Sequence, residues 1–178
     1  NPEEVTRVRH ISVMGDYIKL FGCKSIETEH KDILARQEVA FGKPFVEKLQ
    51  SLRIGVIGSG GTGSAILTVI SRSGVGEIVN IDDDKLEGSN LNRVRGSKKK
   101  DVGQYKTKVL KDYIDSIELP VLVAEYCCKA DKSPAAVDAL VSCDLIFGCT
   151  DDQIGRELLT VMTYVYSIPI IDMGLGGK

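Results

Sequence analysis

The chain has 178 residues, 43% of them hydrophobic, with a mean hydropathy of −0.01, which describes one domain large enough to bury a core. Its formal net charge of −2 gives no reason to expect nucleic acid or an anionic membrane as a partner. The five cysteines form no Cys-x-x-Cys pair, so neither a zinc site nor a disulfide framework is expected in this segment, and reduced thiols without a signal-peptide pattern predict a cytoplasmic protein.

The first part of the chain has no clear period. Residues 1–27 mix charges with short apolar pieces, and we interpret them as an N-terminal arm that is irregular or partly helical. The apolar spacing in residues 27–42 predicts a helix, which is expected to end at Gly42. Lys43-Pro44 is then expected to break the helical pattern before residues 45–51 lead into the first strand.

From residue 53 onward, short apolar runs alternate with helical patterns. Strands are expected at residues 53–58, 77–84, 120–128, 143–150 and 168–174. Helices are expected between them, at residues 64–74, 102–117, 133–142 and 151–167. This alternation predicts an α/β fold: a doubly wound, Rossmann-like, mostly parallel sheet with helices on both faces.

A glycine-rich loop follows the first predicted strand. It reads Gly58-Ser-Gly60-Gly61-Thr-Gly63 and contains G-x-G-x-x-G between a strand and a helix, which is a nucleotide-binding fingerprint. The first glycine permits a tight turn, the second lets phosphate oxygens approach the backbone, and the third lets the helix pack on the sheet. The helix N-terminus adds unpaired N–H groups. The alternative is a glycine-rich turn that binds nothing.

Three acids, Asp82, Asp83 and Asp84, end the second predicted strand. They follow the loop by about 20 residues, where the fingerprint places an acid that binds ribose hydroxyls. We expect one of them to bind ribose and at least one other to be a solvated turn acid. These features fit NAD as well as ATP.

Four further motifs bear on the choice between NAD and ATP. They are Arg36-Gln37, Ser89-Asn-Leu-Asn-Arg93, Gly103-Gln-Tyr-Lys106 and Cys149-Thr-Asp151. With the glycine loop and the acids, they resemble the ThiF/MoeB/HesA family, the adenylating domain of ubiquitin-activating-type enzymes. The resemblance covers residues 36–174 and implies a ThiF-type nucleotide-binding adenylation domain at 28–178. Family members continue with further strands and a crossover loop, so this domain is expected to be truncated at its C-terminus.

The resemblance also implies roles for single residues. Arg93 and Lys106 look like the cations that grip the triphosphate, which must be neutralised as a carboxylate approaches it. Asp151 resembles the Mg²⁺ ligand, Asp84 (beside Asp82) the ribose-binding acid, and Asn90 a further nucleotide contact.

Arg36 resembles the arginine finger of the family, which reaches the phosphates bound by the neighbouring subunit. That role requires a homodimer or pseudo-dimer. The alternative is an ordinary exposed arginine on a helix.

The implied function is ATP-dependent adenylation of the C-terminal carboxylate of a ubiquitin-like or sulfur-carrier protein, giving an acyl-adenylate and pyrophosphate. Two alternatives are an NAD-dependent oxidoreductase and a non-catalytic partner subunit of a heterodimeric activating enzyme, but neither gives Arg93, Lys106 and Asp151 a joint role. A dehydratase acting on a modified tRNA nucleoside shares the motifs and is not excluded. None of the five cysteines is expected to form a thioester.

Overall fold

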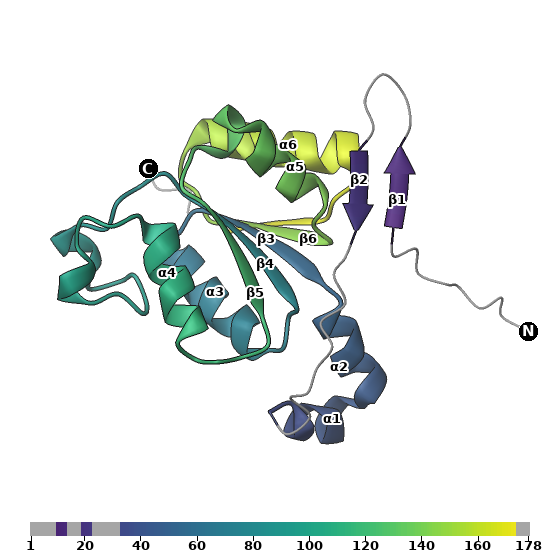
Figure 1. Cartoon of the computed structure of the whole chain (residues 1–178). Helices are drawn as coiled ribbons and strands as arrows, with labels where there is room; N and C mark the ends of the chain where they lie inside the picture. The colour runs from purple at the N-terminus through teal and green to yellow at the C-terminus, as the bar shows by residue number, and fades with distance from the viewer. Residues whose placement is uncertain (1–9, 14–18, 23–32, 174–178) are drawn as a thin grey trace, which may run out of the picture.

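The N-terminal part of the chain contains a strand pair. A computed structural model describes residues 10–13, 19–22 and 33–173 (Figure 1). Strands β1 (His10–Val13) and β2 (Lys19–Gly22) pair antiparallel. The expected irregular or helical arm is therefore wrong at these two segments, since strands of 4 residues are too short to show a period in the sequence. The other residues of the arm, and those of the predicted helix before residue 33, lie outside the described ranges.

Two helices precede the main sheet, α1 (Ala35–Phe41) and α2 (Lys43–Gln50). The predicted helix end at Gly42 is confirmed, and this glycine has a φ of 85°. The predicted break at Lys43-Pro44 is wrong, because α2 begins at once with Pro44 in its first turn. Proline is tolerated there since a first-turn N–H has no partner within the helix.

The main sheet is parallel throughout, in the order β5-β4-β3-β6-β7. Its strands are β3 (Arg53–Ile57), β4 (Glu77–Ile81), β5 (Leu122–Tyr126), β6 (Leu145–Gly148) and β7 (Ile170–Asp172). The chain runs outward from β3 to β5 and then returns to place β6 on the other side of β3. This reversal creates a crevice at the carboxyl ends of β3 and β6, where open α/β sheets bind ligands.

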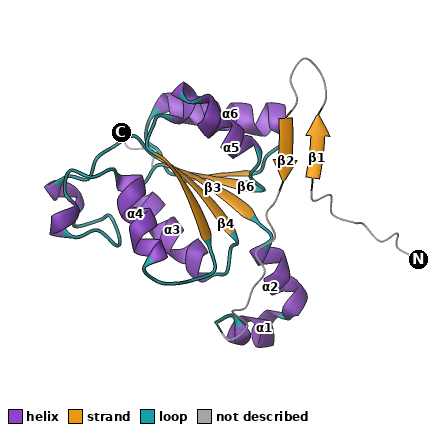
Figure 2. Ribbon diagram, in the orientation of Figure 1, coloured by secondary structure: helices purple, strands orange, loops and turns teal. Residues whose placement is uncertain are grey.

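Helices cover both faces of this sheet (Figure 2), which confirms the doubly wound α/β fold. One face carries α3 (Gly61–Arg72) and α4 (Lys106–Asp115), and the other carries α5 (Pro134–Val141) and α6 (Gln153–Tyr166). Short 3-10 helices lie in the connections, at Gly88–Asn90, Lys99–Asp101 and Ala130–Lys132. Within the described ranges, none of the helices has both the length and the apolar character that crossing a bilayer requires.

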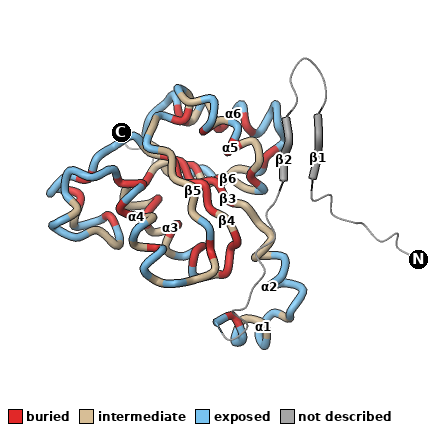
Figure 3. Tube along the Cα trace, viewed as in Figure 1, coloured by how far each residue is buried: buried red, intermediate tan, exposed pale blue. Residues whose placement is uncertain are grey.

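Each face of the sheet has its own apolar core. Leu67 of α3 and Leu110 of α4 are fully buried on one side, and Leu140 of α5 and Met162 of α6 on the other. Figure 3 shows the buried residues concentrated on the central strands, whereas α1 and α2 are mostly exposed. Both faces of the central strands are therefore closely packed, which limits the movement of the strands that lead to the carboxyl edge.

Side-chain caps fix the starts of two helices. The Ser133 hydroxyl accepts a hydrogen bond from the Ala136 N–H at 3.3 Å, and Pro134 follows it, as such a helix start favours. Asp152 caps α6 by accepting from the Gly155 N–H at 3.2 Å. The neighbouring carboxylate of Asp151 is thus not needed for the helix.

Candidate functional site

A cavity of about 660 Å³ lies at the carboxyl ends of β3, β4, β5 and β6. Segments that directly follow these strands line it: the glycine loop, residues 82–84, residues 128–131 and residues 149–152. Arg93, from the connection between β4 and α4, and Lys106, the first residue of α4, also line the wall. Motifs far apart in the sequence therefore meet in one place.

The glycine loop touches the end of β6. Gly58 has a φ of 96°, and a Cβ added there would lie 2.6 Å from the Cys149 carbonyl oxygen. Gly60 and Gly61 line the cavity, and no side chain caps the N-terminus of α3 at Gly60. The first N–H groups of α3 therefore lie at the cavity and have no hydrogen-bond acceptor within the helix. A helix N-terminus of this kind can bind an anion.

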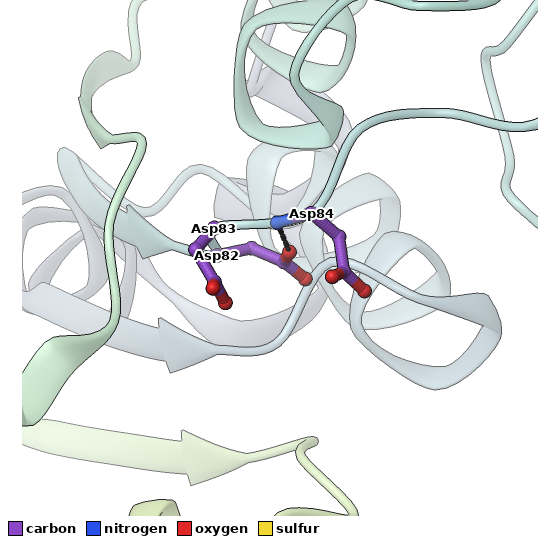
Figure 4. A group of neighbouring side chains, drawn as sticks. All are labelled: Asp82, Asp83 and Asp84. Atoms are coloured by element: carbon purple, nitrogen blue, oxygen red, sulfur yellow. Dashed lines mark hydrogen bonds between the residues drawn. The ribbon is translucent and has the colours of Figure 1, made fainter.

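Asp82 is held by two backbone groups, and Figure 4 shows the one from Asp84. Its carboxylate accepts the Ser59 N–H at 2.5 Å and the Asp84 N–H at 2.7 Å. Burial raises the pKa of Asp82, although these hydrogen bonds and the Lys106 charge oppose the rise. The Ser59 hydroxyl also donates to the Asn80 Oδ1 at 2.7 Å, and both residues are fully buried. The end of β4 and the glycine loop thus form one connected unit.

Carboxylates suited to a metal ion lie at two points of the cavity. Asp82, Asp83 and Asp84 lie side by side (Figure 4), and one carboxylate oxygen from each lies within 4.8 Å of the other two. Asp151 lines the opposite side, after β6, and is exposed. Within residues 33–173, no hydrogen bond or ion pair engages the Asp151 carboxylate. Oxygen ligands of this kind are those that Mg²⁺ prefers, so the donor set fits the expected ion.

The two predicted cations are anchored differently. The side chain of Lys106 is 10% exposed, and its Nζ lies 2.6 Å from the Asp84 Oδ2. Arg93 is exposed and donates to the Ser89 carbonyl oxygen at 2.8 Å, with its aliphatic part against Gly61. Lys129 is a third cation in the wall.

Acids outnumber these cations around the cavity. Of the described residues, the lining includes three cations, Arg93, Lys106 and Lys129, but also the aspartates 82, 83, 84, 131, 151 and 152. A polyphosphate entering this space would meet net repulsion. Additional positive charge, such as a divalent cation, would therefore strengthen its binding.

Three predicted site residues lie outside the lining. Gly63 packs beneath the loop, where an added Cβ would lie 1.8 Å from the Gly58 carbonyl oxygen. Asn90 is buried, accepts the Glu87 N–H at 3.1 Å, and its carbonyl oxygen accepts the Arg93 N–H at 3.0 Å. It supports the turn that carries Arg93.

Arg36 is the third of these residues. Its neighbour Gln37 donates to the Arg72 carbonyl oxygen at 3.3 Å, at the C-terminal end of α3. The 12 residues of α3 span about 18 Å, with the glycine loop at the other end. Helix α1, which carries Arg36, therefore lies near the end of α3 that is far from the glycine loop (Figure 1), and Arg36 does not line the cavity of its own chain.

Sequence reasoning missed the lining segment 128–131, which follows β5. Its signal was available, because the carboxyl ends of parallel strands meet at one edge of a sheet. The residues after the third predicted strand should have been assigned to the same crevice.

Comparison with known proteins decides the family. The model of the ThiF family matches residues 34–177. The chain belongs to the ThiF family. This confirms the resemblance drawn from the motifs, and the cavity described above is the site that the ThiF motifs surround.

Relatives and solved structures agree with this family. The chain is 35% identical over 124 residues to "Adenylyltransferase and sulfurtransferase UBA4" of Debaryomyces hansenii, covering 70% of this chain and 28% of that protein. The chain thus spans less than a third of that relative's length. Crystal structures of E. coli TcdA with ATP (TM-score 0.73, 22% identity, 83% of this chain and 60% of that one) and of E. coli MccB with AMPCPP and MccA (TM-score 0.68, 22% identity, 81% and 45%) share the fold.

Two buried cysteines of this ThiF domain are poor nucleophiles. Burial raises the pKa of Cys143 to about 12 and that of Cys149 to about 11. Cys127, in contrast, is exposed. We expect iodoacetamide at pH 8 to alkylate Cys127 before Cys143 and Cys149, which should remain free thiols in the folded protein because the thiolate is the reactive form. Peptide mass spectrometry would measure this order, and equal rates in the folded and urea-unfolded protein would contradict it.

Proposed function

We propose that this chain binds ATP with Mg²⁺ and adenylates the C-terminal carboxylate of a ubiquitin-like or sulfur-carrier protein. The observation that carries the proposal is that Arg93, Lys106 and Asp151, from three separate segments, line one cavity with the glycine loop. An NAD-dependent oxidoreductase would leave these three residues without a shared task. A non-catalytic scaffold would need none of them.

The chemistry requires little beyond positioning and charge. The substrate carboxylate attacks the α-phosphorus, the new acyl–phosphate bond forms, and the bond to pyrophosphate breaks. No general base is needed, because a carboxylate is already ionised at neutral pH. Arg93 and Lys106 stabilise the charge of the phosphates, and the open N–H groups of α3 bind their oxygens.

Asp151 would hold Mg²⁺ together with phosphate oxygens, since this ion usually takes one or two protein carboxylates. When bound, the ion offsets the negative charge that the aspartates of the lining add to that of the nucleotide. Asp82, held rigidly at the end of β4, would accept hydrogen bonds from ribose hydroxyls.

Names of similar proteins support the kind of substrate. The relative from Debaryomyces hansenii is called an adenylyltransferase and sulfurtransferase, and the MccB structure contains a second molecule, MccA. These names support a carrier protein or peptide tail as the acyl substrate. TcdA is named a tRNA dehydratase, so a modified tRNA nucleoside stays the alternative substrate. A cytoplasmic location is part of the proposal and rests on the free thiols of the described cysteines.

We also propose that Arg36 serves the cavity of a second subunit. It lies on α1, beyond the reach of its own site, on a helix that buries none of its residues. Val39 and Phe41 of this helix are 90% and 65% exposed. A partner subunit packed on α1 would cover these apolar side chains and receive the arginine.

Exchange of labelled pyrophosphate into ATP tests the adenylation. With the carrier protein present, Asp151→Asn is expected to lower the exchange rate at least about tenfold, because a metal ligand is lost. Asp112→Asn makes the same chemical change on the exposed face of α4 and should leave the rate unchanged. Mg-ATP, but not NAD, should also raise the melting temperature. Protection by NAD alone, or equal exchange rates in both variants, would rule the proposal out.

A further inference from the structure

Asp84 and Lys106 are tied together twice. The Lys106 N–H donates to the Asp84 carbonyl oxygen at 2.9 Å, and the Lys106 Nζ lies 2.6 Å from the Asp84 Oδ2. An isolated antiparallel bridge between Lys85 and Tyr105 holds the same two segments side by side. The position of the ammonium group therefore depends on Asp84.

The burial of the two side chains is unequal. The Lys106 side chain is 10% exposed, whereas that of Asp84 is 65% exposed. A largely buried ammonium group needs a partner, because leaving it unpaired costs its solvation. The exposed carboxylate of Asp84 supplies that partner at little cost to itself. Both residues line the cavity, so a carboxylate oxygen occupies one of the positions around the ammonium where a phosphate oxygen could bind.

We propose that Asp84 is a positioning residue for Lys106 that competes with phosphate for its ammonium group, and that it is not the ribose-binding acid. This inference rests on the proposed function, in which Lys106 binds phosphate. Asp84 holds the lysine at the cavity wall in the free protein and weakens the binding of the first phosphate oxygens. Asp82, whose carboxylate is fixed by the N–H groups of Ser59 and Asp84, is then left for the ribose.

Inorganic tripolyphosphate separates these roles, because it has phosphates and no ribose. We would measure its binding and that of ATP by calorimetry, without Mg²⁺ and at low ionic strength, where charge effects are largest. Asp84→Asn is expected to tighten both ligands about threefold, the scale of a partly exposed ion pair. The matched control is Asp83→Asn, since Asp83 lies in the same carboxylate cluster and, within residues 33–173, forms no ion pair or hydrogen bond with the Lys106 ammonium group. It should tighten binding less.

Repeating the change in a Lys106→Met background isolates the competition. In the Lys106→Met background, Asp84→Asn should raise the affinity for tripolyphosphate and ATP no more than Asp83→Asn does, because the ammonium group is gone. Three results would each overturn the inference: weaker ATP binding in Asp84→Asn, a gain that survives in the Lys106→Met background, or wild-type protein that binds no tripolyphosphate. Circular dichroism and melting temperature would verify that every variant is folded.

Failure of the proposed function would look different. If the wild-type protein binds tripolyphosphate with this pattern but never exchanges pyrophosphate into ATP, Asp84 keeps its role and adenylation is rejected. If exchange occurs and Asp84→Asn weakens ATP binding, adenylation stands and the role of Asp84 is rejected.

Discussion

Replacing Gly63 by alanine is expected to lower the melting temperature strongly, whereas replacing Gly60 should leave the melting temperature unchanged and weaken nucleotide binding. A Cβ at Gly63 would lie 1.8 Å from the Gly58 carbonyl oxygen and 2.8 Å from its carbon. Both are backbone atoms, so only a shift of the loop or of α3 could relieve the overlap. Overpacking of this kind costs about 1–3 kcal/mol or more, a large part of the 5–15 kcal/mol that holds a typical domain folded.

Gly60 provides the matched control in the same loop. A Cβ there meets no atom within 4 Å, and its φ of −74° is open to alanine. Gly60 lines the cavity, however, and a methyl group would occupy the space through which phosphate oxygens approach the backbone. Thermal melts and ATP calorimetry on both variants would test this separation. A Gly63→Ala protein with the wild-type melting temperature, or a Gly60→Ala protein with wild-type ATP affinity, would contradict it.

The sheet was predictable because its strands are short, almost wholly apolar and bounded by polar or turn residues. Arg53–Ile57 and Glu77–Ile81 lie inside the ranges expected for them. Helix boundaries were less accurate. The third helix begins at Gly61 and not at residue 64, because glycine has a low helix propensity that close packing against the sheet overrides. The helix expected from residue 102 begins at Lys106, since Gly103 has a φ of 94° and Tyr105 is extended.

The sequence predicted several of the residues that line the cavity but not how they contact one another. Motif order indicated that Asp84, Arg93 and Lys106 share a site, and the cavity contains all three. Their mutual contacts depend on how the segment between residues 85 and 105 folds back. Lys85 pairs with Tyr105, and no local pattern in the sequence predicts a pairing between residues so far apart in the chain. Residues 128–131 were missed because Cys127 and Cys128 extended the apolar strand pattern beyond its end at Tyr126. The assignment of each residue to ribose, phosphate or metal stays a prediction.

Replacing Arg36 by alanine is expected to slow pyrophosphate exchange by about 10²-fold or more, because arginines that stabilise phosphate charge from a neighbouring subunit have effects of this size or larger. The stability of the subunit should change little, since α1 buries none of its residues. A loss of activity alone would not show where the arginine acts. Placing two substitutions on the same chain or on different chains of a dimer would show where it acts.

Heterodimers purified through two different tags separate action within a subunit from action across the interface. If one chain carries Arg36→Ala and the other Asp151→Asn, the first chain's intact cavity receives Arg36 from the second, and about half of the wild-type activity returns. If one chain carries both substitutions and the other neither, the intact cavity faces an alanine and activity stays low. An arginine acting within its own chain gives the reverse: no activity in the first arrangement and about half in the second. That reversal, or a strict monomer with full exchange activity, would remove Arg36 from the neighbouring site.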